Sequence, residues 1–152
     1  MKLNNIKISN YRCFKEAAID FDDHITLVVG KNGAGKTAIL DAVAVSVSTF
    51  LLGIDGGVSR SILKDDARYE FHDLNGTIDP QHQFPVSIES TGDCLNQQTV
   101  KWIRSLNSES GKTTIKDAGE LTGLAKKAQN QIMTGDKSLV LPLISYLASP
   151  FF

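Results

Sequence analysis

The feature that most constrains this chain is a glycine-rich stretch over residues 30–37, Gly-Lys-Asn-Gly-Ala-Gly-Lys-Thr. It has the spacing of a phosphate-binding loop, with Gly30, Gly35, Lys36 and Thr37 at the fixed positions. Glycines allow backbone conformations closed to other residues, so several amide groups can surround one oxygen-rich anion. An apolar stretch at 25–29 predicts a strand before the loop, and a long apolar stretch after it predicts a helix. The sequence therefore predicts a nucleotide site rather than a plain glycine-rich turn.

Two side chains of this loop have a definite expected role toward a bound nucleotide. The ammonium of Lys36 is expected to reach the outer phosphates, and the hydroxyl of Thr37 is expected to ligate Mg²⁺. The amino end of the following helix carries partial positive charge, which favours phosphate at the same place. A nucleotide with Mg²⁺ is therefore the predicted ligand.

The order of the expected elements predicts an α/β fold, a mixed sheet of the P-loop NTPase kind with an antiparallel β-lobe. The 152 residues are enough for a single domain with a hydrophobic core. Alternating apolar residues predict strands over 1–11 and 17–21 ahead of the strand at 25–29. The helix is expected from Thr37 to about Leu52, and its nearly all-round apolar surface predicts burial against a partly parallel sheet.

The rest of the chain is expected to form the antiparallel lobe. Residues 53–83 are acidic and glycine-rich, which predicts surface loop with short elements. Two apolar runs at 84–91 and about 97–106 predict a hairpin, and 112–115 is a candidate third strand. The single domain 1–152 is thus divided into 1–52, 53–83 and 84–152.

The final third of the chain predicts one helix and one strand. The helix is expected from Asp117 to Thr134, with Asp117 and Glu120 forming a capping box. Residues 139–146 are apolar on both faces, which predicts a buried strand, and Pro142 places it at an edge or bulge. Asp41, the one charge in the first helix, is expected to be a satisfied structural carboxylate.

Charge and cysteine content limit the partners and the compartment. The formal net charge is −1, so any contact with DNA must come from a local patch. Residues 101–127 supply a candidate patch, although an ordinary solvated face is the favoured alternative; its basic residues are Lys101, Arg104, Lys112, Lys116, Lys126 and Lys127. Cys13 and Cys94 are expected to be reduced thiols, and no apolar run approaches ~20 residues. A cytoplasmic protein with no membrane contact is predicted.

Two motifs in the first 52 residues, Asn10-Tyr11-Arg12-Cys13-Phe14 and the run from Val29 to Val43, resemble the N-terminus of ABC-type ATPases of the SMC/RecF class. Residues 84–146 are more loosely similar to AAA-like ATPases of bacterial defence operons, of the Septu and retron-associated types. The resemblance implies an incomplete ABC lobe I-like fold that binds ATP and Mg²⁺. It also implies dimerisation driven by ATP and coupled to DNA maintenance or anti-phage defence.

The same resemblance implies roles for single residues. Asn32, Gly33, Ala34 and Gly35 would form the anion cradle, while Lys36 and Thr37 would hold phosphate and Mg²⁺. Arg12 matches an arginine that lies near the nucleotide in relatives. The alternative for Arg12 is a surface cation beside Glu16. No catalytic residue is predicted.

The chain also departs from that family. An acidic residue after a later apolar strand, a serine-glycine signature loop and a histidine switch are needed for hydrolysis, and the sequence contains no acidic strand end and no Leu-Ser-Gly-Gly-like run. The chain is therefore expected to be part of a longer ATPase, and turnover by this chain alone is doubtful.

The sequence leaves three alternatives to parts of this interpretation. The first is a non-catalytic truncated head that pairs with a second copy or a full-length ATPase. A nucleotide kinase is disfavoured because residues 53–83 hold only Arg60 and Arg68 where an arginine-rich lid is expected. A metal pair of His72 and His82 is disfavoured against two solvated histidines, since no ligand spacing supports a site.

Overall fold

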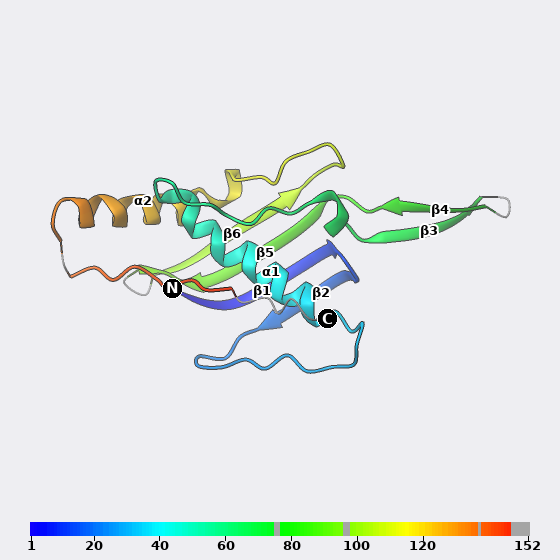
Figure 1. Ribbon diagram of the computed structural model, residues 1–152, viewed down its shortest axis with the longest axis horizontal. Helices are drawn as coiled ribbons and strands as arrows, with labels where there is room; N and C mark the ends of the chain where they lie inside the picture. Colours follow the sequence, from blue (N-terminus) through cyan, green and yellow to red (C-terminus); the bar gives the residue numbers. More distant parts are fainter. Residues whose placement is uncertain (75–76, 96–97, 137, 147–152) are drawn as a thin grey trace.

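The computed structural model describes residues 1–74, 77–95, 98–136 and 138–146. Its main element is a four-stranded antiparallel sheet in the order β2-β1-β5-β6 (Figure 1). The strand bounds are β1 Lys2–Tyr11, β2 Phe14–Asp20, β5 Val86–Asp93 and β6 Thr99–Leu106. These strands confirm the two predicted at the start of the chain and the predicted hairpin at 84–106. Residues 96–97, between these two strands in the sequence, lie outside the described residues.

One face of the sheet is apolar and carries both helices. The buried and partly exposed residues of β5 alternate along its whole length, as expected for a strand covered on one side. Helix α1, Lys36–Ser48, packs on β1 and β5, and a 3-10 helix, Thr49–Gly53, continues it. Helix α2, Gly119–Met133, packs against that 3-10 helix and β6.

Two hydrophobic clusters fill the space under the helices. The cluster below α1 includes Ile8 and Ile88 from the sheet and Val45 from the helix. The cluster below α2 centres on Trp102, Phe50 and Leu121. Because both clusters lie on one sheet face, the opposite face stays polar, and its ion pair between Lys101 and Glu89 is 2.9 Å long.

Residues 53–83 contain more structure than the sequence indicated. A short 3-10 helix, Lys64–Asp66, leads into an antiparallel hairpin of β3, Tyr69–Leu74, and β4, Thr77–His82. The hairpin projects from the end of the molecule opposite α2 (Figure 1). The prediction of short elements is confirmed, but their pairing into a hairpin was not expected. The Asn75-Gly76 dipeptide of the sequence, a strong hairpin signal, could have indicated it.

Two predicted strands do not form. Residues 25–29 pair with no strand in the described ranges, and Ile25, Leu27 and Val29 are 81%, 79% and 77% exposed. Residues 139–146 are also unpaired, with Val140 82% and Leu143 96% exposed. Every strand pairing between described residues is antiparallel, so the parallel part of the expected sheet is not formed. The α/β class and the antiparallel lobe are confirmed.

Two smaller predictions near the second helix were wrong. Helix α2 begins at Gly119 and has no side-chain cap, because Asp117 lies in a preceding 3-10 helix, Lys116–Ala118. Residues 112–115 form no strand, although the backbone N–H of Thr114 donates to the carbonyl of Ser105, 2.7 Å away.

Within the described residues, one stretch, Lys36–Gly53, has the length and apolar composition of a membrane span. Half of it is buried, because α1 and the 3-10 helix after it lie on the sheet. This is the behaviour of the core helix of a globular domain.

Candidate nucleotide-binding site

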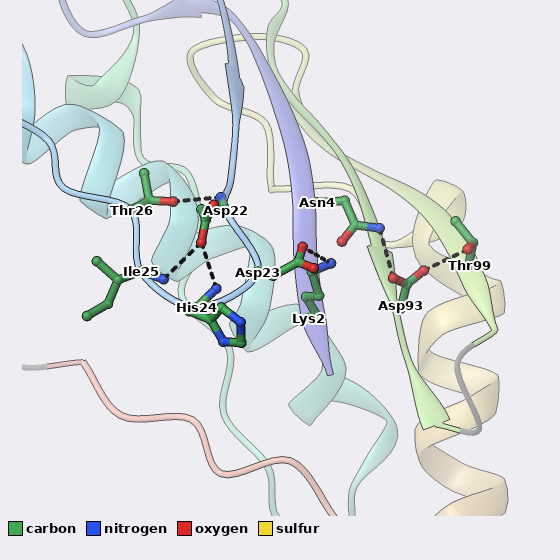
Figure 2. Close-up of polar contacts among 9 residues, drawn as sticks. All are labelled: Lys2, Asn4, Asp22, Asp23, His24, Ile25, Thr26, Asp93 and Thr99. Atoms are coloured by element: carbon green, nitrogen blue, oxygen red, sulfur yellow. Dashed lines mark hydrogen bonds and ion pairs between the residues drawn. The ribbon is translucent and has the colours of Figure 1, made fainter.

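The chain enters the glycine loop through a turn fixed by Asp22. Its carboxylate accepts hydrogen bonds from the backbone N–H groups of His24 at 2.9 Å and Ile25 at 3.4 Å (Figure 2). The N–H of Asp22 in turn donates to Oγ1 of Thr26, 2.9 Å away. The two backbone hydrogen bonds lower the pKa of Asp22. Neighbouring Asp23 pairs with Lys2 at 2.6 Å, which fastens the turn to the start of β1.

The backbone of the loop requires glycine at Gly33 and Gly35. Gly33 and Gly35 have φ angles of 81° and 87°, in the left-handed region that favours glycine. A Cβ atom on Gly35 would lie 2.6 Å from the ring of Phe14 and 2.7 Å from Sγ of Cys13. Gly35 is also the N-cap residue, directly before the start of α1 at Lys36. The absence of a side chain therefore allows the amino end of α1 to lie against the turn between β1 and β2.

Lys36 is oriented by the loop itself. Its ammonium donates to the backbone carbonyls of Gly30 and Lys31, at 2.7 and 2.8 Å. Both contacts are exposed to solvent, so an anion entering the loop can compete with them for the ammonium. The side chain is held close to where the motif predicts phosphate.

A cavity of about 630 Å³ lies over this loop. It is lined by Arg12, Cys13, Asn32, Gly33, Gly35, Lys36, Thr37 and Ala38. The structure thus brings together six of the seven residues predicted from the sequence. The seventh, Ala34, lies in the same loop, where its N–H donates to the carbonyl of Lys31 at 3.2 Å.

Arg12 reaches the cavity from the turn between β1 and β2. Its guanidinium pairs with Asp41 through Nη1 and with Asp66 through Nε, the latter at 2.8 Å. Burial opposes the charge, but the hydrogen bond to Asp66 and the fields of Tyr11 and Asp41 together raise the pKa of Arg12. Arg12 therefore pairs with Asp41 and Asp66, and the alternative of a surface cation beside Glu16 does not apply.

The carboxylate of Asp41 contacts three side chains. Besides Arg12, it pairs with Arg60 at 2.7 Å and accepts a hydrogen bond from the hydroxyl of Tyr146 at 2.9 Å. That hydrogen bond raises the pKa of Tyr146. The expectation of a satisfied structural carboxylate is confirmed. Sequence reasoning missed the ion pair between Asp41 and Arg12. The available signal was that Asp41 lies one helical turn after Thr37 and therefore on the same side of the helix as the phosphate loop.

The basic patch is smaller than the sequence suggested. Arg104 is 2% exposed and donates from Nε to the carbonyl of Thr114, 2.8 Å away, and from Nη1 to Oγ1 of Thr49, 3.0 Å away. Burial lowers its pKa. Including Arg104 in the patch was wrong, because it lies on the inward face of β6 with Val100 and Trp102. The five lysines of the patch are exposed.

No group of three or more metal-binding side chains occurs within the residues that the structure describes. His72 pairs with Asp79 and His82 with Tyr69 in the hairpin register, which puts the two histidines on opposite faces. The pair therefore cannot share one metal ion. Cys13 is exposed and Cys94 is buried, and both are free thiols.

A glycine-rich loop that opens a helix packed on a sheet is the arrangement of P-loop nucleotide-binding proteins. The comparison with family models gives the narrower class: the model described as an AAA domain matches residues 5–149. The chain belongs to this AAA-domain family and is of the SMC/RecF-like, ABC-class type.

Curated relatives match part of the chain. The DNA replication and repair protein RecF of Flavobacterium johnsoniae is 54% identical over 43 residues, 28% of this chain and 12% of RecF. RecF of Chlorobium phaeobacteroides is 35% identical over 89 residues, 59% of this chain and 23% of that protein. The DNA double-strand break repair Rad50 ATPase of Pyrococcus abyssi is 38% identical over 47 residues, 31% of this chain and 5% of Rad50. The chain therefore spans less than a quarter of the length of these relatives.

A solved structure shares the fold over most of the chain. It comes from work on ATP-driven dimerization and DNA-stimulated activation of SMC ATPases, with a TM-score of 0.52 and 18% sequence identity. The similarity covers 82% of this chain and 80% of the other. It supports the fold class.

Proposed function

We propose that this chain is the ATP-binding domain of an SMC/RecF-like ATPase and that ATP with Mg²⁺ binds in the cavity over residues 30–37. The observation that carries the proposal is the convergence of Lys36, Thr37 and Arg12 on one cavity beside left-handed glycines. Backbone amides, an ammonium and a guanidinium are the groups that bind a polyphosphate.

Each residue has a separate role in this proposal. Asn32 to Gly35 cradle the phosphates with backbone N–H groups, and Lys36 neutralises the outer phosphates. Thr37 ligates Mg²⁺, which supplies charge neutralisation of the β- and γ-phosphate oxygens when it is bound. Arg12, which lines the same cavity, contacts the polyphosphate through its guanidinium.

The biological setting is proposed from relatives and from sequence. Relatives named for DNA replication and repair support a DNA-associated, cytoplasmic ATPase. The solved structure named for ATP-driven dimerization of SMC ATPases supports dimerisation with ATP. The exposed lysines 101, 112, 116, 126 and 127 are the proposed DNA contacts. The proposed pathway is either DNA maintenance or anti-phage defence. Little turnover is expected from this chain alone, because its sequence has no acidic strand end and no signature loop.

Binding and turnover of ATP test the proposal directly. Titration of a fluorescent ATP analogue with Mg²⁺ is expected to show binding that Lys36→Ala lowers at least about tenfold, since a charge-assisted phosphate contact is lost. Lys7→Ala is the matched control, because Lys7 lies on the opposite face of the sheet and is exposed. Equal binding by the Lys36→Ala variant and the unaltered chain would reject the nucleotide site. Robust hydrolysis that depends on Lys36 would instead reject the prediction of little turnover.

A second candidate function is a non-catalytic module that pairs with another copy or a longer ATPase. It is favoured by an apolar groove of about 640 Å³ between α1 and residues 58–60 and 144–146, lined among others by Leu40 and Val58. Size-exclusion chromatography with light scattering discriminates the two functions. A strict monomer that binds nucleotide would argue against pairing with another copy. Phe151-Phe152, two apolar residues that such pairing would use, lie outside the described residues.

A further inference from the structure

We infer that Asp66 and Asp41 are positioning residues that hold the guanidinium of Arg12 toward the cavity over residues 30–37. Through Arg12 they set the affinity for the outer phosphates of a nucleotide. This inference rests on the proposed function, since it requires a nucleotide in that cavity. Neither aspartate itself lines the cavity, whereas Arg12 does.

The backbone fixes where the side chain of Arg12 begins. Arg12 has a φ angle of 50°, a left-handed conformation that non-glycine residues adopt only where the surroundings hold them. Its backbone N–H donates to the carbonyl of Asp66 at 2.6 Å. Two residues earlier, at the end of β1, the carbonyl of Asn10 accepts the N–H of Arg68 at 2.9 Å. The end of β1 and the first residue of the turn are thus attached to residues 66–68.

The two carboxylates then fix where the side chain ends. Asp66 binds Nε of Arg12 through Oδ1 and accepts the N–H of Leu63 through Oδ2 at 3.0 Å, so neither oxygen can turn freely. Asp41 binds Nη1 through Oδ2, and its Oδ1 is held by Arg60 and Tyr146. A planar guanidinium held at two of its nitrogens has a defined orientation.

This arrangement leaves part of the guanidinium for a ligand. Within the described residues, the ion pairs of Arg12 use Nε and Nη1, and its side chain keeps 32% of its exposure. Nη2 takes part in neither ion pair, and we assign its N–H groups to a phosphate oxygen. Lys36 and Thr37 line the same cavity, and Asp41 lies one helical turn beyond Thr37 on α1. Helix α1 therefore carries both the proposed Mg²⁺ ligand and a carboxylate that orients Arg12.

The sign of the effect separates positioning from simple electrostatics. Two carboxylates near a polyphosphate repel it, so neutralising one of them would strengthen binding if charge alone mattered. If Asp66 acts by orienting Arg12, neutralising it weakens binding. The same substitution therefore gives opposite results under the two explanations.

The experiment measures binding of fluorescent ATP and ADP analogues, with Mg²⁺, to the full chain and its variants. Asp66→Asn is expected to lower the affinity for the ATP analogue about tenfold and to affect the ADP analogue less, because Arg12 is assigned to the outer phosphates. Unchanged or tighter binding of the ATP analogue would overturn the inference. Glu70→Gln is the matched control, since Glu70 is also ion-paired to an arginine, Arg68, but belongs to the projecting hairpin.

Two further variants keep the test decisive if Asp66→Asn does not fold. Arg12→Lys keeps the charge but cannot contact two carboxylates and a phosphate in one plane, so its loss should match that of Arg12→Ala. Wild-type affinity in Arg12→Lys would contradict the inference. Asp41→Asn is expected to weaken binding in the unaltered chain and to have no further effect in Arg12→Ala. Additive losses in that double variant would also overturn it.

The outcome for Lys36→Ala distinguishes failure of the proposed nucleotide site from failure of the positioning role alone. If Lys36→Ala binds as tightly as the unaltered chain, the proposed nucleotide site itself is wrong. If Lys36→Ala loses binding while Asp66→Asn and Arg12→Lys do not, the site stands and only the positioning role fails.

Discussion

Strands β5 and β6 and the apolar segments 25–29 and 139–146 have similar sequence signals but different outcomes. In β6, Val100 and Trp102 are each 1% exposed, whereas Leu27 and Leu143 in the two segments are 79% and 96% exposed. All four stretches are rich in residues that favour strands. The difference is that β5 and β6 pair with each other and lie under helices, while the two segments pair with no described strand. Apolar sequence predicts a strand only where a neighbouring strand can satisfy its backbone groups.

The largest expected effect contrasts a core residue with an exposed one. Trp102→Ala should lower the free energy of unfolding by about 3–5 kcal/mol, because it removes a fully buried side chain and leaves a cavity. It also removes the hydrogen bond that the indole donates to the carbonyl of Ser46 at 3.1 Å. Leu143→Ala should change stability by less than about 0.5 kcal/mol. Urea unfolding of both variants measures the contrast, and similar losses would show that 139–146 is buried in solution.

The next effect separates the buried arginine from the exposed lysines of the basic patch. Arg104→Met should destabilise the fold by about 1–3 kcal/mol, since it leaves the acceptors on Thr114 and Thr49 without their donor. Lys126→Met should have an effect below about 0.5 kcal/mol. Thermal unfolding measures stability, and DNA titration at two salt concentrations measures binding. Lower DNA affinity in a folded Arg104→Met variant would contradict its burial.

A smaller effect is expected within the glycine loop. Gly35→Ala should cost about 1–2 kcal/mol, because alanine disfavours a left-handed backbone and its Cβ would meet Phe14 and Cys13. Gly33→Ala should lower the free energy of unfolding by only about 1 kcal/mol. Its left-handed backbone disfavours alanine, but a Cβ there meets no atom within 4 Å. Thermal unfolding and nucleotide titration of both variants give the comparison. An equal loss in the two variants would mean that contact with the β1–β2 turn contributes nothing.

The smallest effect concerns the turn that leads into the unpaired segment 25–29. The hydrogen bonds from His24 and Ile25 lower the pKa of Asp22, so its folded-state pKa lies below its unfolded value. Its contribution to stability is therefore present above the ordinary aspartate pKa of about 3.9 and is lost as pH falls through the lowered pKa. The unfolding midpoints of Asp22→Asn and the unaltered chain should converge as the pH is lowered into that window. A constant difference from pH 6 downward would contradict this origin.

Much of the site and part of the fold could be predicted locally. The loop 30–37, helix α1 and strands β1 and β2 follow from short spacings and from period-two alternation, which depend on neighbouring residues alone. The hairpin β3–β4 was missed, although the Asn75-Gly76 dipeptide of the sequence is a strong hairpin signal. Arg104 was misplaced because it was counted by charge and not by its register with Val100 and Trp102.

The sequence by itself determined that a glycine-rich loop opens an apolar helix, and that Arg12 precedes it in a motif that resembles the N-terminus of SMC/RecF-like ATPases. Tertiary structure alone decided that Arg12 meets Asp41 and Asp66, which are 29 and 54 positions away along the chain. It also decided that the apolar segments 25–29 and 139–146 stay unpaired. The physical reason is that ion pairs and strand pairing join residues distant in sequence, and no local pattern encodes which partner the fold brings near.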